Sequence, residues 1–142
     1  MHHDDGRQFF ETWFDRLWTK LDASVIEDMC VEDVCVWGLE GKRVGRAQFA
    51  AFYQALRASF PEGLAVSVDE ALARDTTVMA RCTARGRAKN GSDVAFSGFL
   101  QATIVDGRMT TAWNCWDFVA LLEQCGPLSP GTLERGFSSI AR

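Results

Sequence analysis

The segment that decides the fold, residues 113–126, reads Trp-Asn-Cys-Trp-Asp-Phe-Val-Ala-Leu-Leu-Glu-Gln-Cys-Gly. It begins as a predicted strand, because two tryptophans and a cysteine stand in a β-prone run. It ends as a short predicted helix over Val119–Gln124, since Gly126 stops a helix and Pro127 prevents its return. Asp117 stands at the junction among large apolar side chains. An ionised carboxylate there needs a partner, a raised pKa or access to water.

Two interpretations of Asp117 follow from this position. An Asp between a strand and a helix often serves as the N-cap and accepts a backbone N–H two or three residues further on. Alternatively, the carboxyl group faces a cavity and acts there as an acid or base, because perturbed carboxylates cluster at functional sites. The segment itself does not decide between the two.

Residues 64–117, which end within this segment, have the alternation of β-strands. The pattern predicts strands over 64–73, 77–88, 94–105 and 109–117. Asn90-Gly91 and Asp106-Gly107 between them are hairpin-turn sequences.

The first 60 residues have mainly helical periodicity. The predicted elements are an aromatic helix over 10–21, a short helix over 24–30, a strand over 34–39 and a helix over 46–59. Ser24 and Glu27 have capping-box spacing, and Pro61 ends the third helix. Helices followed by an antiparallel meander predict an α+β fold with the helices on one face of the sheet.

The length of 142 residues fits one domain, with a core over about 8–126 and a C-terminal tail over 127–142 that contains a short segment at 133–140. Ten Phe and five Trp predict a large core or an apolar pocket. Nineteen acidic residues against fifteen basic ones give no electrostatic reason to bind nucleic acid or an anionic membrane.

Five cysteines without a Cys-x-x-Cys pair are expected to be free thiols in a reducing compartment. The N-terminus has no leader pattern, and the longest uncharged run, 94–105, is too short to span a bilayer. We therefore expect a cytoplasmic protein.

Several kinds of site have no support in the sequence. The two histidines are both at the N-terminus, so there is no imidazole for a catalytic triad or the usual zinc site. The phosphate-binding, dinucleotide-binding and nucleophile-elbow motifs are missing. We expect neither a metal nor a cofactor.

Arg81 is the other charged residue of interest, because it falls in mid-strand beside Met79. Arg85, Arg87 and Lys89 on the same strand face fit a solvated surface near a turn. A mid-strand charge needs a partner, and Asp117 is one option, although the sequence does not fix strand register.

Five short segments in order resemble the SnoaL-like polyketide cyclases of the nuclear transport factor 2-like superfamily. They are Gly-Arg-Ala-Gln-Phe-Ala-Ala-Phe (45–52), Ser-Phe-Pro-Glu (59–62), Met-Ala-Arg-Cys-Thr (79–83), Asp-Gly-Arg-Met (106–109) and Trp113…Asp117…Leu-Leu-Glu-Gln-Cys-Gly (121–126). The likeness covers about residues 10–126. It implies a cone-shaped α+β barrel around an apolar cavity, closed by N-terminal helices and forming a homodimer through the sheet.

The resemblance also implies a function: cofactor-free intramolecular aldol ring closure of polyketide esters, with an aspartate near the end of the last strand as general acid/base. Asp117 matches that position. Under this hypothesis Arg81 orients or polarises an apolar carbonyl substrate, and the walls are formed by Trp13, Trp37, Tyr53, Phe99 and Trp113.

Two other hypotheses remain open. Thr103 and Thr111 stand where the family often carries a basic and an acidic residue, which favours a non-catalytic binder of a small apolar ligand in the same cavity. A dimeric interaction module would instead need a large exposed apolar patch.

Overall fold

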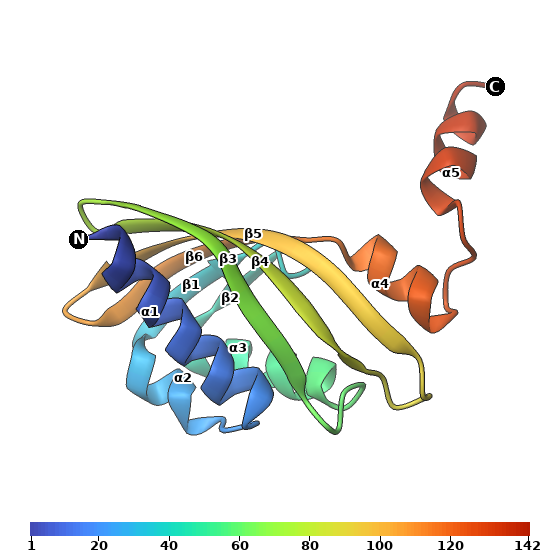
Figure 1. Cartoon of the computed structure of the whole chain (residues 1–142). Coiled ribbons are helices and arrows are strands. Elements are labelled where there is room, and N and C mark those ends of the chain that lie inside the picture. The colour runs from blue at the N-terminus through green and yellow to red at the C-terminus, as the bar shows by residue number, and fades with distance from the viewer.

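The computed structural model describes all residues, 1–142, as a curved six-stranded sheet with helices on its concave face (Figure 1). The strands lie in the order β2-β1-β6-β5-β4-β3. Their bounds are β1 Cys30–Trp37, β2 Lys42–Val44, β3 Leu64–Arg74, β4 Thr77–Arg87, β5 Asp93–Val105 and β6 Arg108–Trp116. The helices are α1 His3–Phe14, the π-helix η1 Asp15–Thr19, α2 Ser24–Met29, α3 Gly45–Arg57, α4 Phe118–Cys125 and α5 Thr132–Ile140.

Strands β3 to β6 form the predicted antiparallel meander. The turn at Asp106-Gly107 has positive φ at both residues, as its sequence predicts. Each of the four strands alternates between an inward buried residue and an outward one over most of its length. The sheet therefore has one apolar concave face and one convex face that is open to solvent.

Strand β1 lies parallel to β6 rather than continuing the antiparallel pattern. Parallel neighbours need a long connection, and α3 with the whole of β3 to β5 lies between these two strands in the chain. The short strand β2 lies between the predicted strand over 34–39 and the predicted helix over 46–59, where the sequence analysis predicts no strand, and it pairs with β1.

The predicted α+β class is confirmed, and the sheet is a curved open layer rather than a closed barrel. Its two edges are β2 and β3, which do not pair. Helix α1 packs along β3, and the Arg7 guanidinium donates to the Val68 carbonyl at a β-bulge between Val68 and Glu70. The helix thus covers one edge of the sheet, where backbone groups would otherwise lack partners.

The predicted helices are present, with two local differences. The first helix begins at His3, before the predicted range of 10–21, and its aromatic stripe runs through α1 into a π-helical turn that ends at Thr19. The predicted capping box of Ser24 and Glu27 is wrong: the Ser24 N–H and hydroxyl both donate to Asp22 Oδ1, and Asp22 also forms an ion pair of 2.9 Å with Arg16.

The core fills the space between the helices and the concave face. All of its fully buried side chains are hydrophobic, and no polar or charged side chain is fully buried. No helix of the fold has the length and apolarity needed to cross a membrane. All five cysteines are free thiols, as expected.

Candidate functional site

An apolar cavity lies between the concave face of the sheet and the helices α1, η1 and α3. Its volume is about 80 Å³, and 21 of its 22 lining residues are hydrophobic. The single polar side chain in the wall is that of Asn114. The cavity can therefore hold an apolar molecule and offer it one neutral polar contact.

Aromatic rings form much of the wall and pack edge to face against one another. The ring centroids of Trp18 and Tyr53 are 5.1 Å apart, and those of Phe14 and Trp116 are 6.1 Å apart. Such offset contacts are the preferred geometry of aromatic pairs. They fix the rings of α1, η1, α3 and β6 relative to one another.

Asn114 and Trp116 both point inward from β6, two residues apart. The Trp116 Nε1–H donates to Asn114 Oδ1 at 3.2 Å. Since an indole can only donate, this contact identifies which end of the Asn side chain is the oxygen. The Asn114 Nδ2 donors have no protein partner and are free to hydrogen-bond a ligand oxygen.

The two ionisable side chains in the wall, Cys30 and Tyr53, both stay neutral at physiological pH. Burial raises the pKa of the Cys30 thiol to about 12 and also raises the pKa of Tyr53. The Tyr53 hydroxyl donates to the Leu17 carbonyl at 2.6 Å and is thus already occupied. Neither group is suited to take a proton from a substrate.

Asp117 lies outside the cavity wall, which corrects the expectation of an inward-facing acid. It is exposed, and Oδ1 accepts the Ala120 N–H at 3.0 Å. It is therefore the N-cap of α4, the first of the two interpretations that the sequence leaves open. Its neighbours Trp116 and Phe118 both line the cavity, so Asp117 lies beside the wall with its carboxylate toward solvent.

Arg81 is on the convex face, also outside the cavity. Its guanidinium lies 3.8 Å from a Glu70 carboxylate oxygen and 4.0 Å from one of Asp69. These two carboxylates, and not Asp117, are its partners. The strand register decides this, because Arg81 pairs with Glu70 on β3 and Phe99 on β5.

The five expected wall residues divide between the two faces of the sheet. Trp13 and Tyr53 line the cavity. Phe99 and Trp113 are exposed on the convex face, where Trp113 stacks on Trp37 with 4.6 Å between ring centroids. For these last three the expectation is corrected, because alternation along a strand separates the faces without telling which one is covered.

Sequence reasoning missed Asn114 and Trp116 as site residues. A signal for them existed, since residues 112, 114 and 116 alternate with Trp113 and Cys115 along one strand. Choosing the inward set required knowing that Ala112 is buried against the helices.

The fold and the apolar cavity place this chain among small α+β proteins in which helices cover one face of a curved sheet. A family model described as SnoaL-like polyketide cyclase matches residues 9–125. The chain belongs to the SnoaL-like polyketide cyclase family, as its motifs indicate. No curated protein matches the chain.

Solved structures with the same fold come from several bacteria. Wild-type IdmH from Streptomyces antibioticus, a proposed polyketide cyclase, is 19% identical with a TM-score of 0.73, over 85% of this chain and 98% of IdmH. A proposed polyketide cyclase from Bacillus cereus ATCC 10987 is 21% identical with a TM-score of 0.74, over 87% of this chain and 80% of the other. An NTF2-like protein of unknown function from Burkholderia pseudomallei is 17% identical with a TM-score of 0.73, over 86% of this chain and 98% of the other. These identities are low, and the likeness shows the fold.

Proposed function

We propose that this protein is a cofactor-independent cyclase or isomerase of a small, mostly apolar carbonyl compound that binds in the cavity. The observation that carries the proposal is a cavity wall with one polar side chain, Asn114, whose oxygen is held by Trp116 and whose Nδ2 donors are free. The family membership and the neighbouring proposed cyclases support the reaction class.

In this proposal the wall folds the substrate and Asn114 stabilises the charge that develops. An intramolecular aldol closure forms one C–C bond when an enolate carbon attacks a carbonyl carbon of the same molecule. The attacked oxygen becomes an alkoxide and then takes up a proton, so the product is an isomer of the substrate. A hydrogen bond from Asn114 Nδ2 to that oxygen acts like an oxyanion-hole donor, which typically contributes about 10²–10³-fold in rate.

Holding the two reacting carbons together is the second contribution. A wall of packed aromatic rings restricts the shapes that a flexible ligand can adopt, and positioning of this kind lowers the barrier of a ring closure. The cavity wall supplies no proton acceptor at neutral pH. The enolate forms when a base removes a proton from the carbon beside one carbonyl group, and the same proton can then return to the alkoxide. The sequence hypothesis assigns this base to Asp117, whose carboxylate is exposed beside the wall, so the substrate must reach it at the edge of the cavity.

The size of the cavity adds a condition. Sites for drug-sized ligands measure about 300–1,000 Å³, and this one measures about 80 Å³. A polyketide-sized substrate therefore requires part of the wall to move outward. The half-buried Phe52 and Leu56 of α3 are among the wall side chains that have solvent on one side.

A non-catalytic binder is the second candidate. The observation that favours it is the lack of an ionised group in the wall, because a binding protein needs apolar area and one polar contact but no acid or base. Both candidates use the same cavity and differ only in whether product appears.

The test uses a linear polyketide ester with two carbonyl groups, incubated with the full chain. Binding is followed by tryptophan fluorescence, and product by chromatography with mass detection of an isomer. Asn114→Leu should lower kcat/KM about 100-fold while the protein stays folded. Gln54→Leu removes an exposed amide of α3 and serves as the matched control with unchanged turnover.

Three outcomes separate the candidates. Turnover that depends on Asn114 supports the cyclase. Binding of the ester with no isomer formed by the wild-type chain supports the binder. Equal turnover by wild type and Asn114→Leu rejects the role of Asn114.

A further inference from the structure

Helix α5 is amphipathic, and its apolar side is uncovered. Leu133, Phe137 and Ile140 recur at i, i+4 and i+7 and are 59%, 69% and 79% exposed. No residue of α5 is buried. A nine-residue helix is marginally stable alone in water, so this side needs a surface to pack on.

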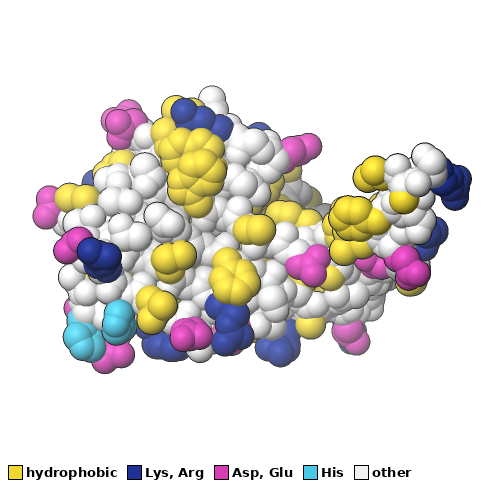
Figure 2. All heavy atoms as spheres, turned by 90° about the horizontal axis from the view of Figure 1, so that it is seen from above, with side chains coloured by type: hydrophobic (Ala, Val, Ile, Leu, Met, Phe, Trp, Pro, Cys, Tyr) yellow, Lys and Arg dark blue, Asp and Glu magenta, His cyan; other side chains and the backbone are white.

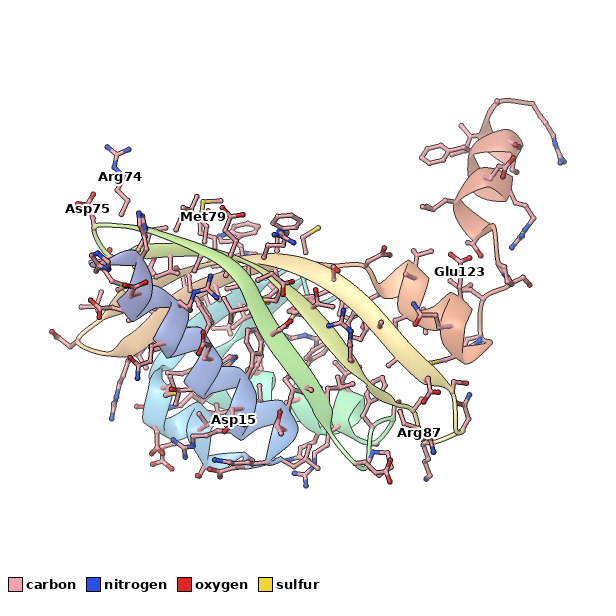
Figure 3. The ribbon with its side chains drawn as sticks, in the orientation of Figure 1. Asp15, Arg74, Asp75, Met79, Arg87 and Glu123 are labelled. Carbon is pink, nitrogen blue, oxygen red and sulfur yellow. The ribbon has the colours of Figure 1, made fainter.

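The linker holds α5 on the convex side of the sheet, opposite α1, α2 and α3 (Figure 1). The Gly131 N–H donates to Glu123 Oε2 at 2.8 Å, and Arg135 donates to the Ser129 carbonyl at 3.0 Å. Glu123 lies at the base of this arm in Figure 3. The position of α5 is therefore anchored by side chains, although no other element packs on the helix.

The convex face carries a second uncovered apolar surface, which we call the outer groove. It measures about 400 Å³, and its apolar residues Leu72, Met79, Phe99 and Trp113 are each more than half exposed. The strand register places Leu72, Met79 and Trp113 in one row across the sheet, with Gln101 between the last two. Figure 2 looks onto this face and shows yellow side chains both on it and on the arm, and Met79 points away from the helices in Figure 3.

We propose that α5 is an exchanged arm: in a homodimer, the apolar side of α5 from each copy packs into the outer groove of the other copy. Both surfaces are on the same side of the molecule, and each lacks a partner. In a two-fold dimer the same contact forms twice, so one arrangement covers both grooves and both helices. This specifies the contact in the homodimer that the sequence resemblance implies, and it does not depend on the proposed function.

The charges of the two surfaces fit this contact. Arg81 and Glu70 line the groove and already lie 3.8 Å apart. Because the two charges are paired, an apolar helix face that covers them leaves no lone buried charge, and the cost of the contact is the desolvation of the pair. On α5 the charged residues Glu134 and Arg135 lie off the apolar side by helical spacing, so they stay in solvent when that side is buried.

The first test measures dimerisation of the full chain by sedimentation. The variant Leu133→Ser/Phe137→Ser/Ile140→Ser should raise the dimer dissociation constant by about 100-fold or more, because it removes the apolar area of the arm. Glu134→Gln/Ser138→Ala changes the other side of α5 and should leave the constant unchanged. A wild-type chain that is monomeric, or a triple-serine variant that dimerises as tightly as wild type, overturns the proposal.

The second test distinguishes exchange from docking on the helix's own sheet. Cys115 lines the groove, and Gly136, which has open space around it, flanks the apolar side of α5. In a background with Cys35 and Cys125 replaced by Ser, a Gly136→Cys/Cys115→Ser chain is mixed with a chain that keeps Cys115, and mild oxidation follows. Exchange predicts a covalent heterodimer. A Gly136→Cys chain with Cys115 retained that oxidises only within itself would show intramolecular docking and overturn the proposal.

Discussion

Gly98 on β5 and Trp116 on β6 are register partners, and the indole of Trp116 lies so close to the glycine that a Cβ there would overlap the ring. The absence of a side chain at position 98 is what lets Trp116 pack against the sheet and reach Asn114. This pair therefore sets the shape of the polar end of the cavity.

Gly98→Ala should displace the indole and weaken its hydrogen bond to Asn114. Overpacking a filled core typically costs about 1–3 kcal/mol, so the urea midpoint should fall and the near-ultraviolet dichroism of tryptophan should change. Gly136→Ala, in open space on α5, is the control and should be neutral or slightly stabilising. An unchanged midpoint for Gly98→Ala would show that the ring has room to move without cost.

Asp117→Ala and Asp117→Asn separate the capping role from the acid/base role. Asn caps a helix about as well as Asp, whereas Ala does not, so the Ala variant should lose about 1 kcal/mol of stability and the Asn variant much less. The measurement is chemical unfolding of both variants beside wild type. If capping is the only role, Asp117→Asn retains turnover, and a loss of turnover without a loss of stability would support the acid/base hypothesis.

Tyr53→Phe should destabilise the junction between η1 and α3. The Tyr53 hydroxyl donates to the Leu17 carbonyl in the π-helix, and both residues are buried. Leaving that carbonyl without a donor costs about 1–3 kcal/mol. Thermal unfolding should show this loss of stability. Trp18→Phe is the comparison variant: it keeps the hydrogen bond but changes the ring beside Tyr53, so it measures the effect of altered packing alone. Equal stability of wild type and Tyr53→Phe would contradict the prediction.

Stability should fall in alkali because of two buried thiols. Burial raises the pKa of Cys30 and of Cys82 from 9.0 to about 12. The unfolded chain releases these protons above pH 9 while the folded chain keeps them, so the stabilisation is complete below pH 9 and is lost as the pH rises toward 12. At about 1.4 kcal/mol per pKa unit, the titration of each thiol should lower the free energy of unfolding by roughly 2 kcal/mol between pH 9 and pH 10.5.

Urea unfolding at several pH values between 8 and 10.5 measures how steeply the free energy of unfolding falls with pH. Cys82→Ala should lower stability at pH 8, because it leaves a small cavity. It should also make the free energy of unfolding fall less steeply as the pH rises above 9, because one of the two thiols is gone. If the variant and the wild type lose stability in parallel above pH 9, Cys82 is not a source of the effect.

Much of the fold could be predicted from local signals. The meander follows from alternation and from Asp106-Gly107 and Asn90-Gly91, and α4 ends where Gly126 adopts positive φ. The parallel pairing of β1 with β6 could not be predicted, because pairing between segments far apart in the chain has no local signature. Ser24 illustrates the same limit. The sequence predicts that its side chain caps the following helix, but in the structure the Ser24 hydroxyl donates to Asp22, which is also paired with Arg16.

The sequence by itself determined the α+β class, the family and the presence of an apolar interior, because periodicity and turn residues act over short distances. Only the tertiary structure decided which residues face that interior. Alternation separates Trp113 from Asn114, but only the position of the helices over the concave face puts Asn114 in the cavity wall and leaves Trp113 exposed on the convex face. Asp117 had two chemically sound roles in the sequence, and the geometry of α4 gave its carboxylate the backbone N–H of Ala120.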